Sequence, residues 1–483
     1  MSDSTISQEQ REPDPAKTLT AQVSMLFSKL RGPNGHLILI VGTALAVHLP
    51  NLLDYPAWFF DEGAYLTFSA QWQQTGHLSY YSHPFGALLI LALLFETLNP
   101  ATYLIPRLLM VAFAAVDGVL LYKLTQAVYK NVVGLPLVAS LVYVATPLSA
   151  RYLRLVVVDN FMVFFLLLAL LVAVTVPRDC MFSALLFGGA LVSKQTAVFF
   201  IPAILVLFRW QKRSLPKTIL WLVIVAIIPA VWILYGTYQV GFSALVSTQL
   251  SLTSLSGERA VFAGNLIVQR ISQRDPFIFL GLAGLLWSIY KRHVLVAFPL
   301  SYILSFVLLF LKISTVYLVP MIPFFSLLGT VLLFDLIDLL QRVPRLKPLH
   351  QIRNHIFAFL VLILIVSSLF LVVYQNPATP QQDALNYVVN QHPQGVIVSY
   401  TYFWLFKQNY PEISVYDRYA VPWNQLRNQT VYLIVDYPGD LNTINEISQY
   451  HDFYFANSTQ STLKVFVDPR SGYAVQVLYG KIA

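Results

Sequence analysis

The stretch VVDNFMVFFLLLALLVAVTV (157–176) decides the fold class, because only one of its residues, Asp159, is charged. A helix needs about 20 mostly apolar residues to cross the roughly 30 Å hydrocarbon layer of a membrane, and this stretch is long enough. Similar apolar runs recur between residues 36 and 374. The sequence therefore predicts an all-α polytopic membrane protein with about eleven transmembrane helices. The expected spans are residues 36–53, 104–122, 132–148, 157–176, 181–192, 197–208, 219–238, 276–290, 294–311, 316–340 and 356–374.

The composition agrees with a membrane protein and limits its partners. Hydrophobic residues make up 57% of the chain and charged residues 11%, whereas soluble proteins carry about 25% charged residues. The net charge is +8, but Lys and Arg lie in short clusters between the apolar runs, which argues against a nucleic-acid groove. The lone cysteine, Cys180, excludes an intramolecular disulfide framework and a thiolate metal cluster.

The basic clusters also predict the topology. They all fall on the cytoplasmic side if the N-terminus is cytoplasmic and if the apolar stretch Pro84–Leu98 does not cross the membrane. We therefore expect this stretch to lie at the outer interface, within an external loop over residues 54–103. If it crossed instead, Lys123 and Lys130 would face outward. Residues 1–35 lack the features of a cleavable signal peptide and are expected to form a flexible cytoplasmic tail.

The pattern changes after the last apolar run. Residues 36–374 are expected to form the transmembrane catalytic domain, and residues 375–483 a small extracytoplasmic α/β accessory domain. Alternating short segments predict helices over 384–391 and 441–449, and strands over 395–400, 430–435 and 463–467.

The polar residues at the outer ends of the spans are the candidate site, because charged groups at membrane depth are costly and usually line a cavity or substrate path. Asp61 and Glu62 are candidates for a general base or a metal-binding corner, and the alternative is an acidic pair that starts a helix. His83 could ligate a divalent cation or contact a phosphate, and the alternative is a structural histidine. Asp159 is a second acidic position on the same side.

Basic residues on the outer side are candidates for binding a lipid phosphate, because they run against the positive-inside trend. Lys194 lies at the predicted outer tip of a broken helical hairpin, and Lys312 at the end of a later span. Snorkelling to the head groups is the alternative for Lys312. Arg154 and Arg270 are further phosphate-binding candidates. For Arg154 a local salt bridge to Asp159 is the alternative, and the loop that contains Arg270 is either a mobile lid or solvated chain.

The order of these features resembles the integral-membrane GT-C glycosyltransferases, in the branch of the protein O-mannosyltransferases and the lipid A aminoarabinose transferases (glycosyltransferase families 39 and 83). The resemblance covers roughly residues 36–340. It implies that Asp61 is the catalytic carboxylate with Glu62 as its neighbour, that Asp159 is the second acidic position, and that Lys194 and Lys312 bind the donor phosphate. The motif segments are Asp61-Glu62, His83-Pro84, Pro106-Arg107-Leu108-Leu109, Arg151–Asp159, Lys194 and Lys312–Pro323.

Two departures from the family bear on specificity. His83-Pro84 resembles the His-Pro-Pro motif of the mannosyltransferases, but Phe85 replaces its second proline. The loop 241–275 is too short for the β-trefoil domain that protein mannosyltransferases carry. The resemblance therefore favours a lipid or a glycan as acceptor over a protein.

The resemblance implies a membrane glycosyltransferase that moves a monosaccharide from a polyprenyl or dolichyl phosphate sugar to an acceptor hydroxyl on the outer face. One general base predicts inversion of configuration, and retention through Glu62 or Asp159 stays open. No cofactor is certain, and a divalent cation is a candidate. The expected location is the cell envelope, in a bacterial inner membrane. Two alternatives are a transporter or flippase of the same lipid-linked sugar and a non-catalytic envelope assembly subunit.

Overall fold

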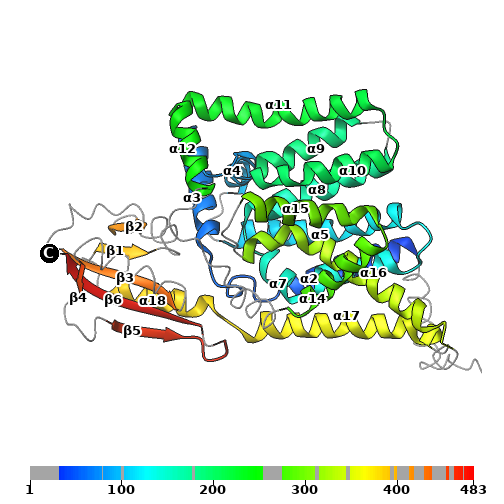
Figure 1. The fold of residues 1–483 in the computed structure, drawn as a ribbon. Helices are drawn as coiled ribbons and strands as arrows, with labels where there is room; N and C mark the ends of the chain where they lie inside the picture. The colour runs from blue at the N-terminus through cyan, green and yellow to red at the C-terminus, as the bar shows by residue number, and fades with distance from the viewer. Residues whose placement is uncertain are drawn as a thin grey trace, which may run out of the picture.

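The structure is a computed structural model. It describes residues 32–78, 80–98, 103–176, 180–253, 275–309, 315–343, 349–391, 396–399, 413–417, 429–437, 453–455, 462–471 and 473–482. Most of the predicted tail, the predicted helix 441–449, Arg270 and Lys312 lie outside these residues. Figure 1 shows long helices side by side, with a small sheet beyond one end of the bundle.

Each apolar run predicted as a span forms a helix in the bundle. The first helix, α2, begins at Pro33, three residues earlier than predicted, and ends at His48. The other helices of the bundle are α5 (Leu104–Val128), α6 (Leu135–Ala145), α7 (Pro147–Tyr152), α8 (Val158–Thr175), α9 (Cys180–Ser193), α10 (Ile201–Trp210), α11 (Leu215–Val240), α14 (Phe277–Tyr290), α15 (Ala297–Leu309), α16 (Ile322–Leu340) and α17 (Leu349–Tyr374), with short 3₁₀ turns η1 (Gln195–Phe200), η2 (Val294–Val296) and η3 (Thr315–Met321).

Five helical segments among the described residues are long and apolar enough to cross a membrane. They are Leu104–Val128, Val158–Thr175, Leu215–Val240, Val316–Leu340 and Ile352–Gln391. The remaining apolar helices of the bundle are shorter than 18 residues. The chain is thus a multi-pass helical membrane protein, and the count of eleven spans stays a prediction.

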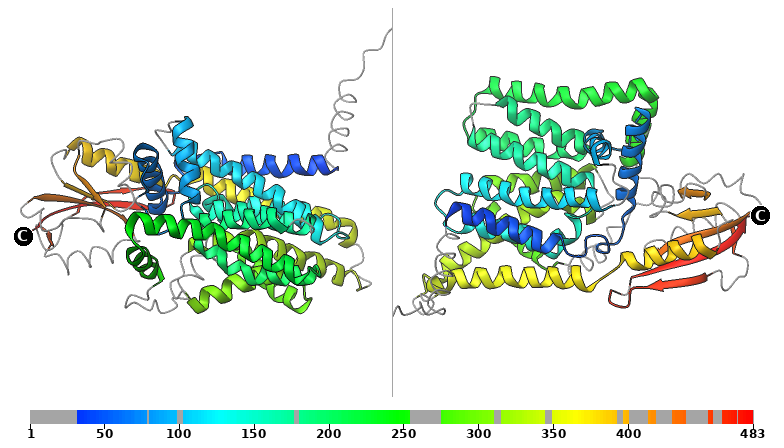
Figure 2. Two further views of the ribbon diagram at one scale, coloured as in Figure 1. Left: turned by 90° about the horizontal axis from the view of Figure 1, so that it is seen from above. Right: turned by 180° about the vertical axis from the view of Figure 1, so that it is seen from behind.

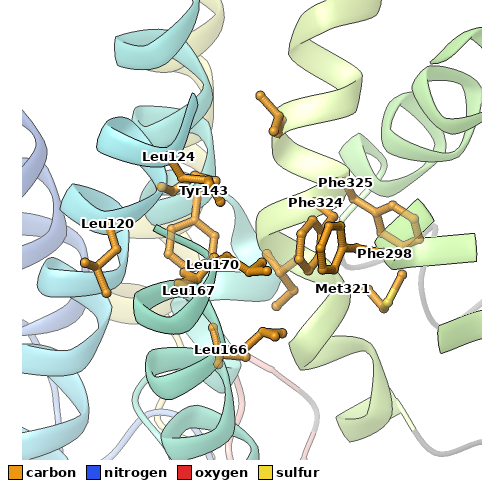
Figure 3. Packing of buried hydrophobic residues seen from close by; sticks show 14 of the residues in the cluster. Leu120, Leu124, Tyr143, Leu166, Leu167, Leu170, Phe298, Met321, Phe324 and Phe325 are labelled. Carbon is orange, nitrogen blue, oxygen red and sulfur yellow. The ribbon is translucent and has the colours of Figure 1, made fainter. Parts of the chain in front are cut away.

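The bundle core is built from closely fitting side chains. Leu166, Leu167 and Leu170 of α8 meet the aromatic residues of α15 and α16 (Figure 3). Phe298 stacks on Phe324 with ring centroids 5.3 Å apart. Lipid tails are as apolar as these side chains, so shape complementarity rather than the hydrophobic effect holds such helices together.

Three helices lie across the end of the bundle that faces the sheet. They are α3 (Phe60–Thr75), α4 (Gly86–Leu98) and α12 (Phe242–Thr253), and they run roughly at right angles to the long helices (Figures 1 and 2). Helix α3 ends at Gly76, whose φ of +69° suits glycine at a helix C-terminus. That Pro84–Leu98 does not cross the membrane stays a prediction.

In the described part of the C-terminal region, helix α18 (Ala378–Gln391) packs against a mixed sheet. The strand order is β2-β1-β3-β6-β4, and β5 also pairs with β6. Strands β1, β3 and β5 confirm the three predicted strands, whereas β2, β4 and β6 were not predicted. The strands are β1 (Val396–Ser399), β2 (Val415–Asp417), β3 (Thr430–Tyr437), β4 (Phe453–Phe455), β5 (Thr462–Val467) and β6 (Ala474–Ile482).

Candidate active site

An ion pair between α8 and the end of α9 forms the base of the candidate site. Asp159 lies in the first turn of α8, and Lys194 lies at the break between α9 and η1, as the predicted broken hairpin requires. The Lys194 Nζ donates to both Asp159 carboxylate oxygens at 2.6 Å. It also lies 4.7 Å from the centre of the Tyr317 ring. Both charged side chains are buried, so an uncompensated charge here would be costly.

Asp61 lies beside this pair. It occupies the first turn of α3, and its side chain is half-buried. Burial raises the pKa of Asp61 to about 6, the positive charge of Lys194 lowers it, and the negative charge of Asp159 raises it. Three charged groups from three distant parts of the sequence therefore share one electrostatic environment. A carboxyl with a pKa near neutrality is well suited to take a proton.

Tyr65 and Tyr80 lie close enough to Asp61 to sense its charge, and His83 packs against both rings. The ring centroids of Tyr65, Tyr80 and His83 lie within 5.8 to 6.0 Å of one another. Burial and the charge of Asp61 raise the pKa of both tyrosines, so their hydroxyls stay protonated and can donate hydrogen bonds. Burial and the Lys194 charge lower the pKa of His83 to about 4, so its imidazole is neutral near pH 7. The His83 Nδ1 lies 3.0 Å from the side-chain oxygen of Gln195.

Glu62 has a different partner from its neighbour Asp61. The Arg107 Nε and Nη2 atoms each donate to one Glu62 carboxylate oxygen at 2.8 Å. The main-chain N–H of Val156 also donates to Glu62, and Arg107 donates to the Leu52 carbonyl at 2.7 Å. Both side chains of this pair are fully buried. The Glu62 carboxylate is thus used to tie α3 to α5, which favours a supporting role for Glu62 over a catalytic one.

Of the other predicted phosphate-binding residues, Arg154 lies among the described residues, where it contacts protein groups. Arg154 donates to the Pro50 carbonyl at 2.5 Å, and its guanidinium lies 5.6 Å from the Tyr55 ring centre. Within the described residues, Asp159 forms its ion pair with Lys194, and no ion pair joins it to Arg154. Lys312 and Arg270 lie outside the described residues.

Two of the candidate metal donors, Glu62 and His83, have protein partners. Glu62 binds Arg107, and His83 contacts Gln195. In the part of the chain that the structure describes, no three His, Cys, Asp or Glu side chains are grouped to hold a metal ion. The role of a divalent cation stays open to experiment.

The sequence gives no role to several residues that the structure brings to the site. Tyr65, Gln195 and Tyr317 belong to quoted motifs or lie next to them, but only the fold places them beside the charged groups. The sequence alone could have singled out Arg107, because a charged residue inside an apolar run needs a partner. The identity of that partner could not be read from the sequence, since Glu62 is 45 residues away.

The comparison with protein families agrees with the resemblance read from the sequence. Residues 82–235 match the family model described as dolichyl-phosphate-mannose-protein mannosyltransferase. This segment includes His83, Asp159 and Lys194 and begins after Asp61. No curated protein matches the chain significantly in sequence.

Solved structures of similar shape belong to the same fold class. ArnT from Cupriavidus metallidurans bound to undecaprenyl phosphate is 13% identical, with a TM-score of 0.55 over 92% of this chain and 98% of that chain. The oligosaccharyltransferase of Archaeoglobus fulgidus in its apo form is 12% identical, with a TM-score of 0.56 over 83% of this chain and 69% of that chain. The GT-C fold predicted from the sequence is confirmed. The family match and the fold together indicate a membrane glycosyltransferase.

Proposed function

We propose that this protein transfers a monosaccharide from a polyprenyl or dolichyl phosphate sugar to an acceptor hydroxyl. The observation that carries the proposal is the half-buried Asp61 carboxyl beside the buried Asp159–Lys194 pair, at one end of an apolar helix bundle. This arrangement supplies a base, a cation for a phosphate and an apolar surface for a lipid tail. ArnT, whose fold is similar, binds undecaprenyl phosphate, which supports a lipid phosphate as part of the donor.

In the proposed reaction, the acceptor hydroxyl oxygen attacks the anomeric carbon of the donor sugar. Asp61 takes the hydroxyl proton, which its pKa of about 6 allows at neutral pH. The bond between the anomeric carbon and the phosphate oxygen breaks, and its electron pair leaves with the lipid phosphate. One such displacement inverts the configuration at the anomeric carbon.

Lys194 would stabilise the leaving phosphate. An ammonium group has three N–H donors, and two of them are directed at the Asp159 oxygens. A phosphate oxygen could take the third or replace one carboxylate oxygen. The protonated hydroxyl of Tyr80 is a further donor near Asp61, and it accepts a hydrogen bond from Tyr65. Donors fixed before the reaction stabilise developing charge without reorganisation.

Two further observations support the class of acceptor and the side of the membrane. The positive-inside distribution of Lys and Arg supports an outer-face site and an extracytoplasmic C-terminal domain. The missing β-trefoil insertion supports a lipid or a glycan as the acceptor. A bacterial inner membrane stays the proposed location.

A transfer assay tests the proposal. Purified protein is incubated with a panel of radiolabelled polyprenyl phosphate sugars and envelope extracts as acceptors, beside Asp61→Asn and with a chelator. We expect turnover of one donor that Asp61→Asn lowers by roughly 10²- to 10⁴-fold, the usual contribution of a general base. Loss of turnover with the chelator, restored by a divalent cation, would identify a metal requirement. Specific donor binding without turnover would favour a transporter or an assembly subunit.

A further inference from the structure

Residue Gln381 of the C-terminal domain holds the main chain just before Asp61. The Trp58 N–H donates to the Gln381 side-chain oxygen at 2.7 Å, and the Gln381 amide nitrogen donates back to the Trp58 carbonyl at 3.3 Å. The Gln381 side-chain amide thus bonds both the main-chain N–H and the carbonyl of Trp58, as the main chain of a neighbouring strand would. The same amide nitrogen donates to the Tyr473 hydroxyl at 3.0 Å. Gln381 is fully buried.

This contact is part of a larger junction between the C-terminal domain and the external loop. The Ala378 N–H, at the start of α18, donates to the Asp54 carbonyl at 3.1 Å. Trp58 stacks on Tyr103 with ring centroids 5.9 Å apart. The loop that leads to Asp61 is therefore fixed on one side by α18 and on the other by the start of α5.

One hydrophobic core joins the two parts. Its buried residues come from α3 and α4, from α18 and the sheet, and also from α5 and α8 of the bundle. Examples are Leu66 of α3, Leu385 of α18 and Phe161 of α8. The helix that carries Asp61 thus shares one hydrophobic core with the C-terminal domain and with the bundle.

From these contacts we propose that the C-terminal domain is a positioning element of the active site, and that Gln381 is its main positioning residue. The proposal rests on the proposed glycosyl transfer with Asp61 as base. Gln381 does not touch the reacting atoms. It fixes Trp58, and Trp58 fixes the start of α3, so that the Asp61 carboxylate stays aligned with the Asp159–Lys194 pair. A misplacement of about 1 Å at a catalytic group can lower a rate by about 10²-fold.

The test compares Gln381→Met with Gln382→Met in the full-length protein. Gln381→Met keeps the side-chain length and removes the hydrogen bonds to Trp58. Gln382 is the matched control, because it lies next in the same helix and bonds to Asn386 one turn later. We expect Gln381→Met to lower kcat by roughly 10- to 100-fold with little change in the donor KM. The control should match the wild type.

Two readouts separate positioning from a general loss of structure. Hydrogen–deuterium exchange should become faster in peptides that contain Trp58 in Gln381→Met, while peptides from α8 and α16 stay protected. The pH midpoint of kcat/KM should move down from about 6, since looser packing lets water reach Asp61. If Gln381→Met does not fold, Tyr473→Phe keeps Gln381 in place and removes one of its partners, and the same changes are expected at a smaller size.

The outcomes distinguish this proposal from the proposed function. Unchanged exchange at Trp58, or faster exchange with wild-type kcat, would overturn the positioning role. A wild-type protein that transfers no sugar from any donor would instead overturn the proposed function, on which this role rests. Faster exchange together with a lower kcat and an unchanged KM would support the positioning role.

Discussion

Two buried ion pairs near the end of the bundle that faces the sheet have similar chemistry and different surroundings. In the Glu62–Arg107 pair both carboxylate oxygens are bound by the guanidinium, and main-chain groups of Val156 and Leu52 complete the hydrogen bonds. In the Asp159–Lys194 pair two N–H donors of the ammonium are used, and Asp61 lies beside it. An ion pair whose hydrogen-bonding groups are all used within the protein can only stabilise the fold. An ion pair with an unused N–H donor can also bind an anion.

The largest effect is expected when the Glu62–Arg107 pair is broken. Arg107→Met leaves the Glu62 carboxylate buried without a counter-charge, which should lower the free energy of unfolding by about 3–5 kcal/mol. Thermal unfolding in detergent, followed by tryptophan fluorescence, measures the change. The double variant Arg107→Met with Glu62→Gln removes the unpaired charge and should recover part of the loss. An unfolding midpoint for Arg107→Met equal to that of the wild type would contradict the structural role of the pair.

Breaking the second pair should affect the reaction more than the fold. Lys194→Met should lower kcat/KM for the lipid-linked donor by roughly 10²-fold, the effect of removing one preorganised donor to a developing charge. Its unfolding midpoint should fall less than that of Arg107→Met, because Asp159 lies in the first turn of α8, where the helix dipole stabilises a carboxylate. Lys194→Arg keeps the charge and serves as the control. Unchanged dependence of the rate on donor concentration in Lys194→Met would remove Lys194 from phosphate binding.

The pH dependence of kcat/KM should be sensitive to the two charged neighbours of Asp61, which are Asp159 and Lys194. Because the base acts as a carboxylate, kcat/KM should rise with pH through a midpoint near 6, the pKa to which burial raises Asp61. Asp159→Asn removes a negative charge and should lower the midpoint, whereas Lys194→Met removes a positive charge and should raise it. A midpoint that moves in neither variant would show that Asp61 does not share their environment.

The smallest effect is expected at Tyr317. Tyr317→Phe keeps the ring over the Lys194 ammonium and should change kcat/KM by less than about threefold, since the cation–π contact depends on the ring face. Tyr317→Leu removes the ring, and the loss of about 0.5–2 kcal/mol should lower donor use by roughly 2- to 30-fold. Equal kcat/KM values for Tyr317→Phe and Tyr317→Leu would show that the hydroxyl or the side-chain volume matters, and not the aromatic ring.

Much of the bundle was predictable from the sequence, and the terminal sheet less so. Apolar runs such as 157–176 and 316–340 identify their helices because a membrane span must be long and apolar. The sheet has no such requirement, so the short segment 474–482 did not stand out, although β6 pairs with three other strands. The predicted residues Asp61, Asp159 and Lys194 do lie together, but their catalytic roles remain proposals.

The amino-acid sequence alone predicts a multi-pass membrane protein with polar residues at the ends of its spans, because the cost of charge in lipid restricts where such residues can occur. Which charges pair depends on the folded structure. Asp61 and Glu62 are adjacent in the chain, yet helix geometry turns one towards Lys194 and the other towards Arg107. Only the tertiary structure places Gln381, 323 residues after Trp58, against the loop that carries Asp61. Such pairings depend on side-chain directions and long-range packing, which no local pattern encodes.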